Sequence, residues 1–371
     1  MPQNIKPLTA MRFFAAIWVV AFHYTPSLGL GMPALVAKGY LGVELFFVLS
    51  GFILSHVYME AFGQRRFVYS EFLWARLARI YPVHLATLAG LGVLIGAAAL
   101  VGMNAGEHVI VWSSLPAQLT LTQAWGLSPM GGWNHPSWSI SAEWFAYLVF
   151  PLFAAVFWPL RRRPALALGA AVLLLIGLNI GFERLSGFPL TRATILWGAL
   201  RIVPCFALGC SIWLLWRTDH IKSATGAVSL LVASLAAIVA NLLVGGPDWL
   251  SVALFGALIL GLGSLTSVGS RLLSGGLWVY LGEVSFAVYM VCIPWELVFT
   301  RALEKVVPSG SEAMAWGPWL LMFAGVTPVA MLAHHLVERP AREIMRRHGV
   351  PFRRIHSPLA ARVAQVAAAR R

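Results

Sequence analysis

The sequence predicts an all-α fold, a polytopic membrane helix bundle of about ten transmembrane helices with both termini in the cytoplasm. Its 371 residues are 59% hydrophobic and only 11% charged, whereas soluble domains carry about 25% charged residues. Charge-poor runs such as Leu85–Met103, Ala165–Ile180 and Ala224–Val244 are about as long as a bilayer core requires. These runs are rich in Leu and Ala and lack the alternation of outer-membrane strands, so they favour helices.

The spans are the apolar runs between charged or Gly/Pro-rich breaks. Arg12 interrupts the first run and no small-residue cleavage site follows His23, so this run is interpreted as a span and not as a signal peptide. Pro136 suits the start of the fourth helix, and the Trp and Tyr residues around it suit the membrane interface. The connections are short, so we expect one membrane domain over residues 1–340. The expected spans are Leu8–Tyr24, Gly39–Tyr58, Pro82–Met103, Ser137–Trp158, Pro164–Phe182, Thr194–Trp216, Ala224–Val244, Leu250–Val268, Leu281–Thr300 and Ala313–Val337.

The positive charges predict the orientation, because cytoplasmic loops retain Lys and Arg during insertion. With the N-terminus inside, most of the 27 Lys and Arg fall on the cytoplasmic side, including the arginines from Arg339 onward. We therefore expect a basic cytoplasmic tail over residues 341–371, either lying on anionic lipid or disordered. Membrane lipids and topology account for the net charge of +13, so nucleic acid is not an expected partner. The outer side holds only Lys38, Arg184, Arg192, Arg301 and Lys305.

Two ionisable residues of the first span share a face. Arg12 and His23 are eleven residues apart, which returns to within about 20° of the same face and separates them by about 16 Å along the axis. Arg12 then marks the inner edge of the membrane, and His23 lies beyond its midplane. A structural reading also exists, in which Arg12 extends to headgroups and His23 bonds a backbone carbonyl.

Further ionisable residues are predicted in the outer halves of other spans, where charge is expensive unless it faces a cavity or a partner. Arg201 and Glu296 are either each other's counter-ion or part of a substrate site. Glu143 follows an aromatic-rich segment without a basic neighbour in sequence, so its partner must come from another helix. Because the following residues come from five spans at similar depth, they predict one polar chamber opening outward: His23, Glu44, Glu143, Arg201 and Glu296.

On the inner side, Arg76 and Arg79 lie three residues apart just before Pro82. Two guanidiniums so spaced can clamp a phosphate, although a positive flank of this kind is also an ordinary topology signal. The sequence has no P-loop, GxGxxG, HExxH or GxSxG motif, which argues against a nucleotidase, a dehydrogenase or a serine hydrolase. The three cysteines lie in apolar spans and predict neither a disulfide nor a metal site, so no metal is expected.

Taken in order, these residues resemble the acyltransferase-3 family of integral-membrane acyltransferases. Arg12 and His23 match its R-x10-H pattern, and GYLGVELFFVLSGF, RLARIYP, WSISAEWFAYLVFP, LGEVSFAVYMVCIPW and LVERPAREIMRR are similar to its later blocks. One departure is Cys292, which stands where the family usually carries His, and Phe286 replaces a Tyr. Without an appended hydrolase-like domain, the chain looks like the stand-alone form of the family.

The resemblance implies an O-acetyltransferase of the cell inner (plasma) membrane. It would move an acyl group, acetyl in the first place, from cytoplasmic acetyl-CoA or another acyl-CoA to a hydroxyl of an extracytoplasmic polysaccharide or glycolipid. Arg76, Arg79 and Arg12 are then expected to hold the CoA phosphates while the pantetheine arm threads toward His23. His23 is expected to act as general base on the acceptor hydroxyl.

The remaining polar residues would complete the transfer site. Glu143 is expected to orient His23 or to bind sugar hydroxyls, and Ser139, four residues before it, to position the acceptor. Glu44, Arg201 and Glu296 would line the substrate-binding side. Direct transfer and a covalent acyl-enzyme both remain open. The rival classes are a transporter of a polar or anionic solute and a membrane scaffold, although no repeated halves of the transporter kind are visible.

Overall fold

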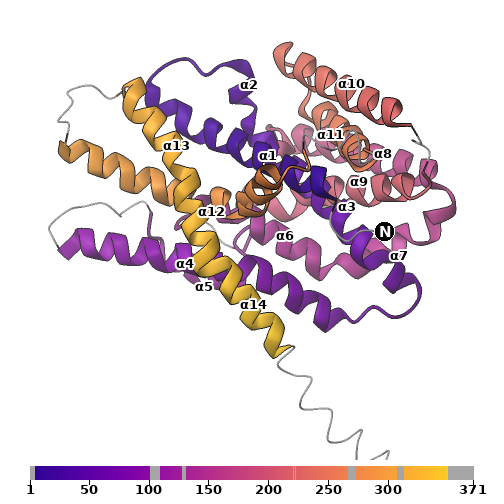
Figure 1. Cartoon of the computed structure of the whole chain (residues 1–371), viewed down its shortest axis with the longest axis horizontal. Helices are drawn as coiled ribbons and strands as arrows, with labels where there is room; N and C mark the ends of the chain where they lie inside the picture. Colours follow the sequence, from indigo (N-terminus) through magenta and orange to yellow (C-terminus); the bar gives the residue numbers. More distant parts are fainter. Residues whose placement is uncertain are drawn as a thin grey trace, which may run out of the picture.

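Long apolar runs form helices here because a helix satisfies every backbone polar group without water. The computed structural model describes residues 5–100, 109–127, 131–219, 221, 223–265, 273–306 and 313–349, and within these ranges it contains helices and no strand. A π-helical turn, His334–Glu338, separates the last two helices. The helices (Figure 1) are α1 (Lys6–Tyr24), α2 (Ala34–Ala37), α3 (Gly42–Gly63), α4 (Tyr69–Leu100), α5 (Leu115–Thr120), α6 (Trp138–Leu148), α7 (Phe150–Phe157), α8 (Pro164–Ser186), α9 (Gly198–Trp216), α10 (Ala224–Leu243), α11 (Asp248–Gly263), α12 (Gly276–Val306), α13 (Trp316–Ala333) and α14 (Arg339–His348).

The predicted membrane bundle is confirmed. In the described part of the chain, eight helical segments are long and apolar enough to cross a membrane, or nine if α6 and α7 count as one span. The shorter apolar helix α11 corresponds to the expected span Leu250–Val268 and brings the number of apolar segments to ten. Peripheral helices such as α8 and α10 expose Leu173 and Val232, which suits surfaces that face lipid. The chain is therefore a multi-pass membrane protein.

Several expected spans have different limits in the structure, and two of these differences have a clear physical reason. The third begins at Tyr69 and not at Pro82, because Pro82 lies inside the continuous helix α4; proline is tolerated within membrane helices whose freed backbone groups find other partners. The fourth, expected as one span over Ser137–Trp158, consists of α6 and α7, which are bent by 55°. Of the expected tail, residues 341–348 belong to α14, and residues 350–371 lie outside the described residues.

The centre of the bundle is the pair α3 and α9, which carry buried side chains along most of their length. Gly51 and Gly209 allow this packing, since a Cβ at either position would collide with the backbone of the other helix. Phe52 and Phe206, next to this contact, are fully buried. The helices of the candidate site are arranged around this pair.

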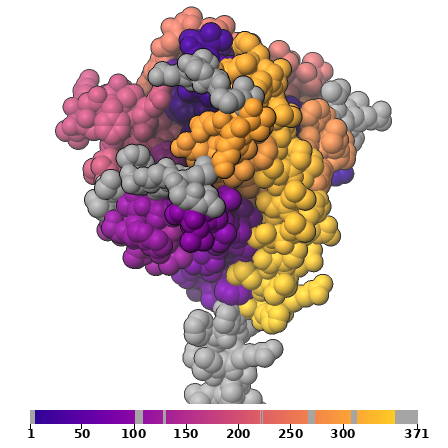
Figure 2. Space-filling view, turned by 90° about the vertical axis from the view of Figure 1, so that its left-hand side faces the viewer, coloured from indigo at the N-terminus to yellow at the C-terminus, as the bar shows by residue number. Residues whose placement is uncertain are grey.

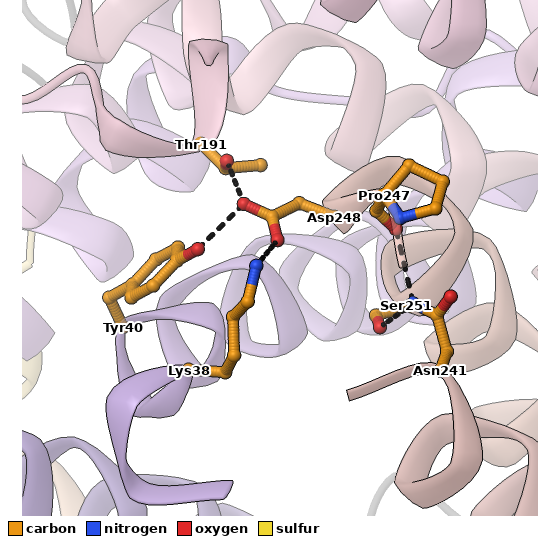
Figure 3. A network of polar contacts seen from close by, with 7 residues as sticks. All are labelled: Lys38, Tyr40, Thr191, Asn241, Pro247, Asp248 and Ser251. Atoms are coloured by element: carbon orange, nitrogen blue, oxygen red, sulfur yellow. Dashed lines mark hydrogen bonds and ion pairs between the residues drawn. The ribbon is translucent and has the colours of Figure 1, made fainter. Parts of the chain in front are cut away.

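One end of the bundle is held together by a polar network around Asp248 at the start of α11 (Figure 3). The Asp248 carboxylate accepts bonds from Lys38 Nζ at 2.6 Å, Tyr40 Oη at 2.7 Å and Thr191 Oγ1 at 2.6 Å. Asn241 donates to the carbonyl of Pro247 at 3.1 Å and thus steadies the turn before α11. This network joins the segments that precede α3 and α9 to the α10–α11 hairpin.

Candidate active site

A cavity of about 190 Å³ lies between five helices, and four charged side chains line it. Helices α1, α3, α4, α6 and α12 each contribute to its wall. Five of the predicted site residues line it: Arg12, Arg76, Arg79, Ser139 and Glu143. The arginines expected to bind the cofactor thus share one space with two residues that were expected farther out.

Glu143 is held in this cavity by two hydroxyl groups. Its Oε1 accepts hydrogen bonds from Ser50 Oγ at 2.7 Å and from Tyr147 Oη at 2.5 Å. Tyr147 lies one helical turn after Glu143 on α6, whereas Ser50 comes from the middle of α3. Arg12 is within electrostatic reach of Glu143. The carboxylate is therefore fixed in position and placed among cationic side chains.

The three arginines carry donor groups suited to an anion. Arg76 donates from Nη2 to Tyr58 Oη at 3.3 Å, and its guanidinium lies 5.6 Å from the centroid of the Tyr58 ring. Its Nε is buried and has no acceptor among the described residues. Arg79 lies close enough to Arg12 for the two positive charges to repel each other. A phosphate would satisfy the free donor and relieve this repulsion, so the residues fit a phosphate-bearing cofactor.

The depth of Glu143 follows from the segment that precedes α6. Asn134 is fully buried and donates to the carbonyl of Met290 at 2.8 Å. This carbonyl has no helical hydrogen-bond partner, because Pro294, four residues later, has no N–H. Tyr289 Oη donates to the carbonyl of Pro136 at 2.9 Å. Since Tyr289 and Met290 lie near the middle of α12, helix α6 begins inside the bundle. Non-helical backbone at this depth is tolerated only where protein surrounds it.

His23 lies apart from this cavity. It occupies the last turn of α1, is partly exposed, and its ring packs edge-on against that of Phe22 at 5.3 Å. His135, at the start of the α6 segment, lies near enough to act on it electrostatically. The described contacts of Glu143 are with Ser50 and Tyr147, so the expected pairing of Glu143 with His23 is not seen.

Glu44 and Arg201 form an ion pair with 0% and 3% of their side chains exposed. Arg201 Nη1 also donates to the carbonyl of Ala193 at 2.7 Å, and its guanidinium lies 4.6 Å from the Trp138 ring centroid. The counter-ion of Arg201 is therefore Glu44 and not Glu296, which is partly exposed on α12. The five residues expected in one outward chamber divide into the cavity residue Glu143, this buried pair, and the separate side chains of His23 and Glu296.

Sequence reasoning missed several residues of the site. Tyr147 could have been found from its position one turn after Glu143, and Ser50 from its place in the apolar block of the second span. Tyr58 carries no such signal, because its pairing with Arg76 joins two different helices. Within the described ranges, no cluster of three or more His, Cys, Asp or Glu side chains could hold a metal ion.

Comparison with known proteins gives a consistent set of similarities. The acyltransferase-3 family model, described as an acyltransferase domain, matches residues 6–335. The chain is 30% identical to acyltransferase MdmB of Streptomyces mycarofaciens over 93% of each protein. It is 31% identical to the exopolysaccharide production protein ExoZ of Rhizobium meliloti, over 88% of this chain and 95% of that protein. It is 22% identical to peptidoglycan O-acetyltransferase OatA of Listeria monocytogenes, over 92% of this chain and 56% of that protein. No solved structure matches the chain.

Proposed function

Because the chain belongs to the acyltransferase-3 family, we propose that it moves an acyl group from cytoplasmic acyl-CoA to a hydroxyl group of an extracytoplasmic glycan or glycolipid. The observation that carries this proposal is the cavity in which Arg12, Arg76 and Arg79 converge with Glu143. An acyltransferase needs a site for its donor, and three arginines with an unsatisfied N–H suit the phosphates of CoA. Acetyl is the proposed acyl group.

The proposed acceptor and sidedness rest on relatives and on charge. ExoZ is named for exopolysaccharide production and OatA for O-acetylation of peptidoglycan, and both names point to glycans outside the cytoplasm. The excess of Lys and Arg on one side of the expected spans supports a cytoplasmic N-terminus and a location in the inner membrane. Arg12, in the first half of α1, would then lie on the donor side.

At the donor end, Arg76 and Arg79 would hold the phosphates, with Arg12 reaching the same anion from α1. Glu143 would keep Arg12 in position and limit the repulsion among the guanidiniums, since its carboxylate is already fixed by Ser50 and Tyr147. The helices around the pantetheine arm would keep bulk water from the thioester, which protects it from hydrolysis.

At the transfer end, His23 would act as general base. Its imidazole would remove the proton of the acceptor hydroxyl while the hydroxyl oxygen attacks the thioester carbonyl. The C–S bond then breaks, and the imidazolium returns the proton to the leaving CoA sulfur. About 16 Å along α1 separates His23 from Arg12, so the pantetheine arm would bridge this distance. Direct transfer of this kind needs no acyl-enzyme.

The acceptor side would be built from Ser139 and Glu296. Ser139 lines the cavity, and its hydroxyl now donates to the Pro136 carbonyl at 3.1 Å, a bond that an acceptor hydroxyl could replace. Glu296 is partly exposed and lies one turn beyond Cys292 on α12. Glu44 and Arg201 are buried and paired, so their proposed contribution is to support this side through Trp138 and not to contact the acceptor.

The proposal is tested by incubating the purified protein with acetyl-CoA labelled in the acetyl group and a bacterial surface polysaccharide. Ester-linked label should appear on the polysaccharide, and it should be released by mild alkali. The matched control is His23→Ala, which should incorporate label about 100-fold more slowly or worse. Uptake of a labelled solute into vesicles without any ester formation would instead support the transporter alternative.

A further inference from the structure

A buried hydrogen-bonded pair lies at the junction between α13 and α14. His334 and Glu338 are 3% and 1% exposed, and His334 Nδ1 is hydrogen-bonded to Glu338 Oε2 at 2.8 Å. The other carboxylate oxygen faces Arg342 Nη1 at 3.8 Å. The residues His334–Glu338 form a π-helical turn, a local distortion that is frequent at functional sites. A carboxylate is buried here only because two cationic or donor groups hold it.

This junction lies against the donor cavity. Trp74 Nε1 of α4 donates to the carbonyl of Met345 in α14 at 2.8 Å, which fixes α14 beside the part of α4 that carries Arg76 and Arg79. Figure 2 shows α13 and α14 running along one side of the molecule, and α14 lies next to α4. Glu338 is within electrostatic reach of Arg12, and Arg79 is within reach of Arg342. Arg342, which is not among the residues that line the cavity, thus lies near Arg79, which is.

The charged side chains of the cavity and of the neighbouring α13–α14 junction carry a net positive charge. Its positive members outnumber its negative ones, and Arg342 and Arg79 repel each other. An excess of arginine at a partly closed site favours an anion with more than one charge. The residues of the group are Arg12, Arg76, Arg79, Arg342 and Arg346 on the positive side and Glu143, Glu283 and Glu338 on the negative side.

We propose that Arg342 is a further contact for the phosphates of the acyl donor, and that the His334–Glu338 pair is a positioning element that aims its guanidinium at them. This inference rests on the proposed function, because it assumes a donor that carries phosphates. It extends the donor site from the membrane helices α1 and α4 to the start of α14. The donor would then be held between α4 and α14 at the mouth of the cavity.

The first experiment measures CoA binding to the full-length protein in nanodiscs by calorimetry. Arg342→Gln should weaken CoA binding about tenfold, the scale of one charge-assisted hydrogen bond. Arg347→Gln is the matched control, since it removes an exposed arginine from the same helix and should leave the affinity unchanged. If wild-type protein does not bind CoA, the proposed function fails. If wild type binds and Arg342→Gln binds equally well, only the present inference fails.

The second experiment separates phosphate recognition from a structural role. With acetyl-CoA, Arg342→Gln should raise KM about tenfold with little change in kcat. With acetyl-pantetheine, which carries the thioester without phosphates, the variant should match wild type. Equal losses with both donors would overturn the inference. So would weaker retention of the variant on anionic vesicles with unchanged KM for acetyl-CoA, because Arg342 would then contact lipid headgroups.

For the His334–Glu338 pair, the charge effect and the positioning role predict opposite changes in CoA affinity. Glu338→Gln removes a negative charge beside an anion site, so charge alone predicts tighter CoA binding. The positioning role predicts weaker binding, because Arg342 loses the carboxylate that holds it. Tighter binding in a folded Glu338→Gln protein would refute the positioning role. His334→Gln provides a second variant, which keeps a donor near Glu338 and should retain more affinity than His334→Ala.

Discussion

Replacing Arg201 by Gln is expected to destabilise the bundle severely. The substitution leaves the Glu44 carboxylate without its cation at a site where neither side chain is more than 3% exposed. It also removes the hydrogen bond to the Ala193 carbonyl and the stacking on Trp138. Removing one partner of a buried pair costs about 3–5 kcal/mol, which corresponds to a loss of about 5 °C in the unfolding temperature for a protein of 371 residues.

The native cysteines allow this loss to be measured directly. Cys205, Cys210 and Cys292 are all buried, so a thiol-reactive fluorogenic dye reports the unfolding of the purified protein on heating. The matched control is Arg301→Gln, which breaks an exposed pair with Glu304 whose side chains are 46% and 59% exposed. Exposed pairs contribute about 1 kcal/mol at most, so the control should melt close to wild type.

A double variant tests whether the loss belongs to the pair. Arg201→Gln combined with Glu44→Gln should recover part of the stability lost by Arg201→Gln alone, because the uncompensated charge is gone. The reasoning would be refuted by an Arg201→Gln protein that melts like wild type and has lost acyl transfer. That result would return Arg201 to direct contact with the substrate.

Three further outcomes are expected. His23→Ala should melt like wild type but lose about 100-fold or more in transfer, the scale of general-base catalysis, and near-normal turnover would remove the proposed base. Replacing Arg76 and Arg79 together by Gln should weaken CoA binding by more than tenfold in calorimetry, and unchanged affinity would leave them as topology signals. A Cys at Gly245 should react with an impermeant maleimide from outside, and a Cys at Arg162 only after permeabilisation; the reverse pattern would invert the proposed orientation.

Most of the fold could be predicted because bilayer thickness and charge act on local stretches of sequence. Each apolar run must bury about 20 residues, and charged residues end it. The exceptions arise where a helix continues beyond the lipid or stops within the protein. Pro82 lies inside α4, and α6 begins among other helices because buried polar contacts of Asn134 replace solvent. Neither arrangement has a signal within a single window of sequence.

The sequence predicts which residues belong to the site, but it does not predict their depth in the membrane or their contacts. Arg12, Arg76 and Arg79 share one cavity, as the phosphate interpretation requires. Glu143 was expected near the outer surface because its span was counted as a full crossing from Ser137. Since α6 begins in the middle of the bundle, Glu143 lies at the depth of Ser50 in α3. Depth counted along the chain fails wherever a span does not start at the membrane surface.

The close approach of α3 and α9 also bears on which parts of the protein can move during turnover. Where Gly51 meets Gly209, backbone contacts backbone with no side chain between them that could change rotamer. Sliding of one helix past the other would drive the chain into Phe206 or Val48, so this pair acts as a rigid unit. Ser50, adjacent to Gly51, anchors the Glu143 carboxylate to that unit. An opening that admits the donor is therefore expected among the other helices that line the cavity, α1, α4, α6 and α12, and not between α3 and α9.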